Sequence, residues 1–243
     1  MASPTPVLLE RFETLSTLLV DEIEARRADD AVHSALWPTV GAVASHVVAV
    51  YRWVTTILRT GSPAQPAEFP LNDDTMTTEL RDARAELLAE LERADRECWV
   101  LGGHTGTTAF WRRRMVLETL KHLLDVRTSP DEQFAEPAEL DVELAVDGID
   151  EFLDVFLARS RATLAPLPGS VLLTATDARR SWRLASDWSL TDDDPPSVTI
   201  EARAGALLLM LWERANPLDE PERFRSVGDR EVMRALLDAP IHP

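Results

Sequence analysis

Cysteine is almost absent from this chain, because Cys98 is its only one. A single cysteine excludes a disulfide bond within the chain and a zinc site built from cysteine pairs. It is also typical of proteins that work in a reducing compartment, so we expect a cytoplasmic protein. Any metal site in the chain must therefore take its ligands from histidine and carboxylate side chains.

Positive charge is scarce as well. The 25 basic residues face 42 acidic ones, which gives a formal net charge of −17. A surface of this charge repels nucleic acid phosphates and anionic membranes. We see no leader sequence and no apolar run that approaches the ~20 residues of a membrane span. We therefore expect a soluble protein with no nucleic-acid or membrane partner, and the sequence does not indicate its oligomeric state.

Lysine is the rarest of the basic residues, since Lys121 is the only one. With abundant alanine, this preference for arginine suggests a GC-rich genome. Actinobacteria and haloarchaea both fit such a composition, and composition alone does not separate them.

The first half of the chain carries apolar side chains at helical spacing. Four amphipathic helices are predicted, at about residues 7–27, 39–60, 76–97 and 107–126. Pro38 is well placed to start the second helix and Gly61 to stop it. The side chains of 72–74 can cap the third helix. Four long amphipathic helices predict a bundle.

The second half changes its hydrophobic period. After a polar stretch at 128–139 and a helical pattern that runs from about 144 to 166, short apolar segments follow. Residues 171–176 and 181–185 are predicted to form a hairpin, 197–201 a third strand, and 205–214 and 230–237 two helices. The 243 residues therefore divide into a four-helix bundle, 1–137, and a smaller α+β domain, 138–243.

Glu118 and His122 stand four residues apart in the fourth predicted helix, and His46 interrupts the apolar second helix. Residues at i and i+4 share one helix face about 6 Å apart, so a carboxylate and an imidazole can bind one cation. His46 is the candidate third ligand. Three protein ligands leave one coordination position open, which is typical of a catalytic zinc site.

Both parts of this cluster have a simpler interpretation. His46 falls among apolar residues of its helix and could be a core histidine whose nitrogens bond to a neighbouring side chain. Glu118 could lie on a solvated face and pair with Arg114 and His122. Trp111 shares that face and indicates that it is at least partly covered. A covered Glu118 needs a counter-ion, which a divalent cation would supply.

Other chemically interesting residues carry weaker signals. The three remaining histidines and Cys98 are interpreted as solvated side chains and a small core residue respectively, and the glycines at 102, 103 and 106 as a turn rather than a phosphate loop. The run Arg112–Arg113–Arg114 is typical of a solvated face, and the alternative is that it attracts an anionic substrate.

The chain resembles the mycothiol-dependent maleylpyruvate isomerase family. The matching segments are Trp37–His46, Cys98–Trp99, Phe110–Met115, Glu118–Thr119 with His122 and Asp125, Ala145–Glu151, Ala175–Asp177 before Trp182, and Leu211–Arg214. The resemblance implies a DinB-like metal-binding four-helix bundle followed by a C-terminal α+β domain. This chain differs from the family in the fourth predicted helix, where family members commonly have a histidine before the glutamate and an Arg-Trp or similar pair before the aspartate. This chain has Leu117 and Leu123–Leu124 at those places.

The resemblance also implies an activity. It places a divalent metal, usually zinc, on His46, Glu118 and His122, with mycothiol as the thiol cosubstrate and a small electrophile, anionic or neutral, as the substrate. Nickel or iron would also suit two imidazoles and a carboxylate. Asp125 would orient a ligand, and the alternative is a plain aspartate on the helix surface. Arg214 would meet a substrate carboxylate, and the alternative is an arginine that ends its helix and complements the helix dipole. We therefore predict a thiol S-transferase or cis-trans isomerase. The alternative is a non-catalytic binding module that keeps the bundle but not the chemistry.

Overall fold

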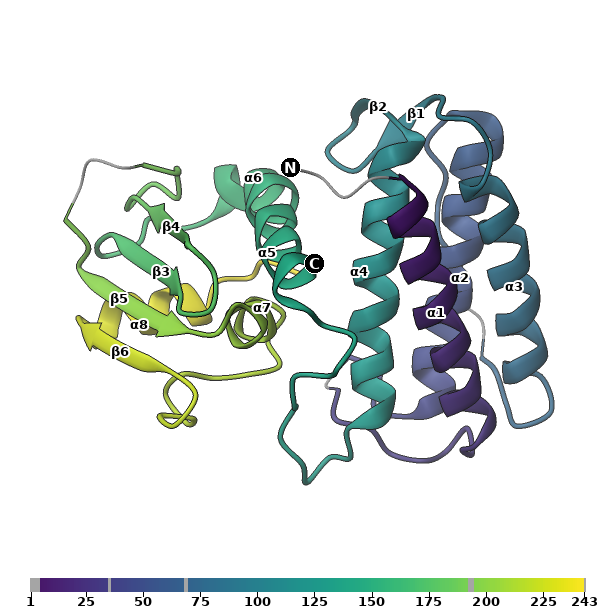
Figure 1. The fold of residues 1–243 in the computed structure, drawn as a ribbon, viewed down its shortest axis with the longest axis horizontal. Coiled ribbons are helices and arrows are strands. Elements are labelled where there is room, and N and C mark those ends of the chain that lie inside the picture. Colours follow the sequence, from purple (N-terminus) through teal and green to yellow (C-terminus); the bar gives the residue numbers. More distant parts are fainter. Residues whose placement is uncertain (1–4, 35, 68–69, 192–194, 243) are drawn as a thin grey trace. The chain divides into compact units, whose positions relative to one another are not determined.

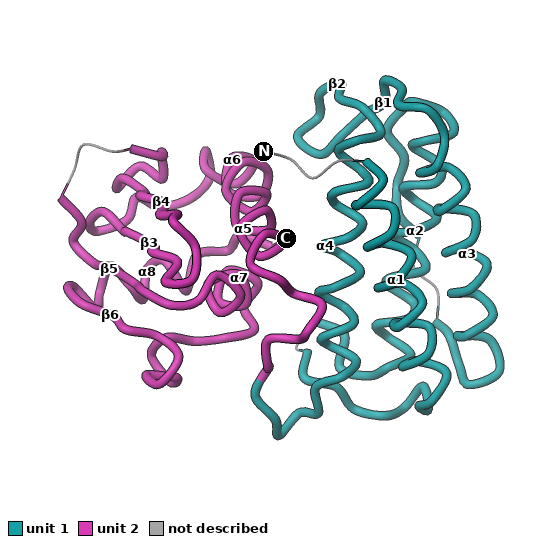
Figure 2. The backbone as a smooth tube through the Cα atoms, viewed as in Figure 1, with its two compact units in different colours: residues 1–133 teal, residues 134–243 magenta. Residues whose placement is uncertain are grey.

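The computed structural model describes residues 5–34, 36–67, 70–191 and 195–242. The chain forms two compact units, Met1–Gln133 and Phe134–Pro243 (Figure 2). The first is helical and the second combines a sheet with helices. The predicted fold class, a four-helix bundle followed by a smaller α+β domain, is confirmed.

The first unit is built from four helices that lie side by side (Figure 1). They are α1 (Thr5–Glu24), α2 (Val40–Thr60), α3 (Met76–Leu91) and α4 (Thr108–Arg127). Local signals set the bounds of α2: the Thr39 hydroxyl accepts a hydrogen bond from the backbone N–H of Ala42, and Gly61 ends the helix in a left-handed conformation with φ of 70°. Helix α1 packs on α4, and α2 packs on α3.

Two features near α3 differ from the sequence prediction. The helix ends at Leu91 rather than near 97, and an antiparallel hairpin of β1 (Glu97–Val100) and β2 (His104–Thr107) follows it. The predicted side-chain cap at 72–74 is also absent, since the helix begins after Thr75 with no side-chain capping bond. Asp73 instead accepts a hydrogen bond from the backbone N–H of Ala28 at 2.6 Å, which joins two loops of the bundle.

Helix α2 is the apolar centre of the bundle. Among the described residues it is the one helix whose length and composition would allow it to cross a membrane, which the sequence analysis did not anticipate. Its most apolar window is 72% buried within the structure, as in the core helix of a soluble protein. Tyr51 of this helix is fully buried, and its hydroxyl lies 2.7 Å from that of Thr119 on α4.

The second unit contains a four-stranded sheet in the order β4-β3-β5-β6. Strands β3 (Val171–Ala175) and β5 (Val198–Ala202) pair in parallel, and β4 (Arg180–Leu184) and β6 (Arg225–Gly228) add antiparallel edges. Strand β6 was not predicted. All four of its residues are exposed, so it lacks the apolar alternation by which a strand is recognised.

Helices cover this sheet. Helix α7 (Ala204–Leu211) contacts β3 and β5, α8 (Arg230–Leu237) contacts β5, and α5 (Val142–Glu151) packs on α7. After α5 the chain continues through a π-helical turn at Phe152–Leu157, the short α6 (Ala158–Ser160) and a 3-10 turn at Arg161–Thr163. The helix predicted at 144–166 is therefore present but irregular. Helix α7 ends at Leu211, three residues before the predicted end at Arg214.

Candidate metal centre

His46, Glu118 and His122 converge inside the first unit. Glu118 Oε1 lies 3.3 Å from His46 Nε2 and 3.1 Å from His122 Nε2. One donor atom from each residue lies within 4.8 Å of the other two. The structure thus brings together the three ligands that the sequence predicted, one from α2 and two from α4.

Burial decides between the two interpretations of Glu118. Its side chain is only 8% exposed and that of His122 is 0% exposed, so the solvated-face alternative is wrong. Helix α4 lies inside the bundle, with both Glu118 and its i+4 partner in the interior. The His46 side chain is 15% exposed, and the neighbour that its Nε2 meets is Glu118 itself.

Glu118 is held as a carboxylate. Burial alone would raise its pKa, but the charges of Lys121, Arg114 and His122 outweigh it and hold the pKa well below its usual range. The two cations act on the second oxygen: Oε2 forms a salt bridge with Arg114 and lies 3.4 Å from Lys121 Nζ. The deprotonated form is the one that binds metal.

Asp125 lies behind His122. Its Oδ2 lies 3.0 Å from His122 Nδ1, and both side chains are 0% exposed. An ionised carboxylate only accepts hydrogen bonds, so Nδ1 carries the proton and donates it. In neutral His122 this leaves Nε2 unprotonated and facing the Glu118 oxygen. A carboxylate behind a histidine is the usual support of a metal-binding imidazole.

The donor set fits a divalent cation. Two imidazole nitrogens and one carboxylate oxygen are common zinc ligands, and bonds of about 2.1 Å in a tetrahedron separate neighbouring donors by roughly 3.4 Å. The two histidine-to-glutamate separations, 3.3 and 3.1 Å, are close to that value.

Trp37 is a part of the centre that the sequence analysis did not assign to it. Its ring lies 3.9 Å from the His46 ring, centroid to centroid and tilted by 31°, and meets His122 edge-on at 5.1 Å. Trp37 precedes α2 in a loop, where no helical period marks a residue as facing the core. The only local signal was its position next to Pro38, at the predicted start of the helix.

Two of the three arginines in the run 112–114 are buried rather than solvated. Arg112 and Arg114 are each 3% exposed. Arg112 donates hydrogen bonds to the backbone carbonyls of Leu91 and Arg93 and to Asp95, while Arg114 binds Glu118. The alternative role, attraction of an anionic substrate, finds no support in Arg112, because its guanidinium is bonded to the chain itself.

The remaining candidates lie elsewhere. Arg214 belongs to the second unit, is half-buried, and donates to the backbone carbonyl of Trp212 at 2.5 Å, so its role toward a substrate stays a prediction. His33, His104 and His242 are exposed. Cys98 is buried in β1, where burial raises the pKa of its thiol, as expected for a core residue.

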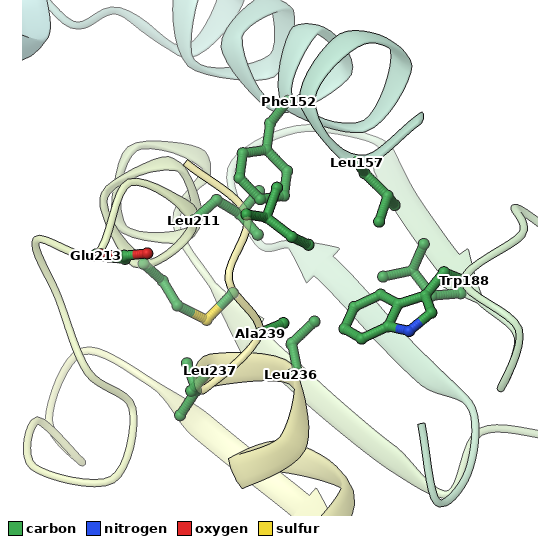
Figure 3. A pocket seen from close by; sticks show the side chains of 11 residues that line it. Phe152, Leu157, Trp188, Leu211, Glu213, Leu236, Leu237 and Ala239 are labelled. Carbon is green, nitrogen blue, oxygen red and sulfur yellow. The ribbon is translucent and has the colours of Figure 1, made fainter. Parts of the chain in front are cut away.

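The second unit encloses an apolar cavity of about 30 Å³ (Figure 3). Phe152, Leu157, Trp188, Leu211 and Leu236 are among the side chains that line it. Ligand pockets for small molecules usually measure about 300–1,000 Å³. The cavity is too small for such a ligand.

Fold and site together define a two-unit protein whose helical bundle holds a buried His-Glu-His cluster. Residues 9–127 match the model of the mycothiol maleylpyruvate isomerase N-terminal domain, and residues 143–235 match that of the MDMPI C-terminal domain. The chain belongs to the mycothiol maleylpyruvate isomerase family, which is a family of enzymes. The predicted resemblance is thereby confirmed.

Solved structures share this fold. A crystal structure of mycothiol-dependent maleylpyruvate isomerase in a histidine-to-alanine mutant superimposes with a TM-score of 0.69 at 11% identity, covering 99% of this chain and 97% of that one. A second crystal structure of mycothiol-dependent maleylpyruvate isomerase gives a TM-score of 0.68 at 12% identity with the same coverage. Identities this low show a shared fold. A search of curated proteins found no match.

Proposed function

We propose that this protein is a metal-dependent enzyme that uses mycothiol, or a closely similar small thiol, to isomerise or conjugate a small electrophile. The observation that carries the proposal is the convergence of His46, Glu118 and His122 on one point in the bundle. The family supports the thiol, because it is named after mycothiol. The metal, with zinc as the first candidate, rests on the donor set alone.

The proposed reaction requires a thiolate. A free thiol is mostly protonated at neutral pH, and a divalent cation bound by these residues would lower its pKa so that the reactive thiolate forms. Glu118 contributes a negative oxygen, and His46 and His122 contribute neutral nitrogens. Asp125 fixes the ring of His122, and Trp37 packs against the ring of His46.

In the isomerisation, the thiol would act as a nucleophile and be regenerated at the end of the reaction. With maleylpyruvate, the thiolate adds to the cis carbon–carbon double bond and the π electrons move onto the conjugated carbonyl group. The resulting single bond rotates, the electrons return, and the carbon–sulfur bond breaks to release the trans isomer and the thiolate. With an electrophile that carries a leaving group, the same attack ends in a stable conjugate. We keep Arg214 as the candidate partner of a substrate carboxylate.

A conjugation assay tests the proposal. The zinc-loaded protein is incubated with mycothiol and monobromobimane, and the fluorescent conjugate is measured with and without chelator. We expect metal-dependent conjugation that is lost in His46→Ala and retained in Cys98→Ser, because Cys98 is buried in β1, outside the cluster. Elemental analysis should find about one divalent ion per chain. Conjugation that is equal with and without metal would contradict the proposal.

A further inference from the structure

A hollow of about 510 Å³ lies at the N-terminal end of helix α2. All of the described residues that line it belong to the first unit, and they come from the first turns of α2 and from the loops before α2 and α3. Ala28, Leu36, Trp37, Ala42 and Leu71 are among them. Pockets for small molecules usually measure about 300–1,000 Å³, so the hollow has room for such a ligand.

The hollow extends to the neighbourhood of the metal centre. Ala42 precedes His46 by four residues, so the two side chains lie on one face of α2 about 6 Å apart. Trp37 lines the hollow and also contacts the centre, because its ring lies 3.9 Å from the His46 ring and 5.1 Å from the His122 ring, centroid to centroid. A ligand in the hollow would therefore lie about one helix turn from a candidate metal ligand.

The lining of the hollow is uncharged. None of the nine described residues that line it carries a charge, although 28% of the chain is charged. Thr39 and Ser45 bring hydroxyl groups, and the other seven are apolar residues or glycine. A charged group moved into these surroundings would lose its hydration without gaining a counter-charge from the lining, whereas burial of an apolar group would be favourable.

Several of the lining side chains keep apolar surface in contact with water. Among the described residues, Leu36 is the most exposed of the large apolar side chains, at 68%. Trp37, Ala42 and Leu71 are half-buried. An apolar ligand in the hollow would remove part of this surface from water, which favours binding.

We propose that the hollow binds an uncharged, apolar group of the electrophilic substrate, so that the substrate class of this enzyme is electrophiles with an apolar substituent. The inference rests on the proposed function and names the substrate class of the same site. The reacting carbon of such a compound lies outside the hollow, on the side of His46. The thiolate sulfur attacks this carbon with an electron pair, the carbon–sulfur bond forms, and the leaving group departs with the electrons of the broken bond.

Three compounds with the same reactive group test the proposal. They are iodoacetamide, N-hexyliodoacetamide and 6-(iodoacetamido)hexanoate, whose chain of similar length ends in a carboxylate. We measure kcat/KM for conjugation with mycothiol by the zinc-loaded protein and subtract the rate in chelator. We expect the value for N-hexyliodoacetamide to exceed that for iodoacetamide about tenfold, because methylene groups leave water. The carboxylate compound should stay within about threefold of iodoacetamide, because its charge opposes entry into the hollow.

Ala42→Leu fills part of the hollow and is the diagnostic variant. We expect its preference for N-hexyliodoacetamide over iodoacetamide to fall to about twofold or less, because the added carbon atoms occupy the space of the hexyl chain. The KM for the electrophile should rise, and the KM for mycothiol should not. Ala85→Leu, on the exposed face of α3, is the matched control and should keep the preference.

A second variant covers the case in which Ala42→Leu does not give the circular dichroism spectrum of a folded protein. Leu36→Ser changes an exposed side chain, so it should fold, and it removes apolar surface from the hollow. We expect it to lower the preference for the hexyl compound about threefold. An unchanged preference in Leu36→Ser would overturn the inference.

The outcomes separate this inference from the proposed function. Metal-dependent conjugation without a preference for the hexyl compound, or with a preference that survives in Ala42→Leu, overturns the inference and leaves the proposed function standing. A rise in the KM for mycothiol alone would assign the hollow to the thiol and overturn the inference as well. If no compound is conjugated in a metal-dependent way, the proposed function fails, and calorimetry with the unreactive N-hexylacetamide decides about the hollow. Binding that Ala42→Leu abolishes would support an apolar site, and no binding would overturn it.

Discussion

The indole ring of Trp37 stacks on the imidazole of His46, with 3.9 Å between the ring centroids. The contact joins the loop before α2 to a predicted metal ligand on that helix. His46 is the most exposed of the three ligands, with 15% of its side chain accessible, so it is the ligand whose ring orientation depends most on a neighbour.

Removing the Trp37 ring should make the orientation of the His46 ring less well defined. Aromatic pairs of this kind are worth about 0.5–1.5 kcal/mol, so Trp37→Ala is expected to weaken zinc binding about two- to tenfold. Trp37→Phe keeps an aromatic face and should bind within about twofold of the unaltered protein. Chelator competition measures both values. Equal affinities for the two variants would show that the stack does not orient His46.

Asp125 should matter for metal affinity although it is not expected to touch the ion. Its carboxylate receives the Nδ1 proton of His122 at 3.0 Å in a fully buried setting. Asp125→Asn removes the charge that favours this tautomer, and changes behind a metal ligand typically cost about 10–100-fold in affinity. Zinc titration of this variant is the measurement. The matched control is Asp82→Asn on the exposed face of α3, which should leave the affinity unchanged.

The stability of the metal-free protein should depend on the ionisation of Glu118. Its folded-state pKa lies well below the ordinary value, because Lys121, Arg114 and His122 together outweigh the effect of burial. A group of this kind stabilises the fold fully above its unfolded pKa, about 4.5, and the contribution disappears as pH falls through the lower folded value. Urea unfolding of the unaltered protein and of Glu118→Gln, both in chelator, should therefore differ most above pH 5.

At neutral pH we expect Glu118→Gln to be less stable by about 3–5 kcal/mol, because it removes a carboxylate that two buried cations contact. The gap should narrow toward pH 3. Glu92→Gln, at the exposed end of α3, serves as the comparison and should show no such trend. A constant difference between the unaltered protein and Glu118→Gln across this range would mean that the carboxylate does not ionise as described.

Arg112 should stabilise the end of α3 rather than bind substrate. Its guanidinium donates to the carbonyls of Leu91 and Arg93, which have no partner within the helix. Arg112→Met should lower the free energy of unfolding by about 1–3 kcal/mol and speed hydrogen exchange in the segment 92–97. Arg113→Met should stay within about 0.5 kcal/mol. Similar losses in both variants would refute the assigned role.

The bounds of a helix could be predicted from the sequence where residues next to its ends determine them. Helix α2 was expected at 39–60 and occupies Val40–Thr60, because Thr39, Pro38 and Gly61 act on their immediate neighbours. Helix α3 was extended too far because the residues after Leu91 are good helix formers. What ends it there includes Arg112, whose bonds to the carbonyls come from a distant helix.

The short strands β1 and β6 were not predicted, for a related reason. Strand β6 is stabilised by its pairing with β5, and β1 by its pairing with β2, in segments of four residues each. Their backbone hydrogen bonds are satisfied by a partner strand, and a segment of four residues is too short for an alternating pattern to be recognised in the sequence.

The sequence by itself determined the helical bundle, the α+β second half and the i, i+4 spacing of Glu118 and His122, since each depends on periodicity or on near neighbours. Only the tertiary structure decided that Glu118 is buried, that His46 of α2 meets it, and that Arg114 and Lys121 hold its second oxygen. Burial depends on which other helix covers a face, and that is set by packing across the whole unit. The charge of the centre is therefore a property of the fold.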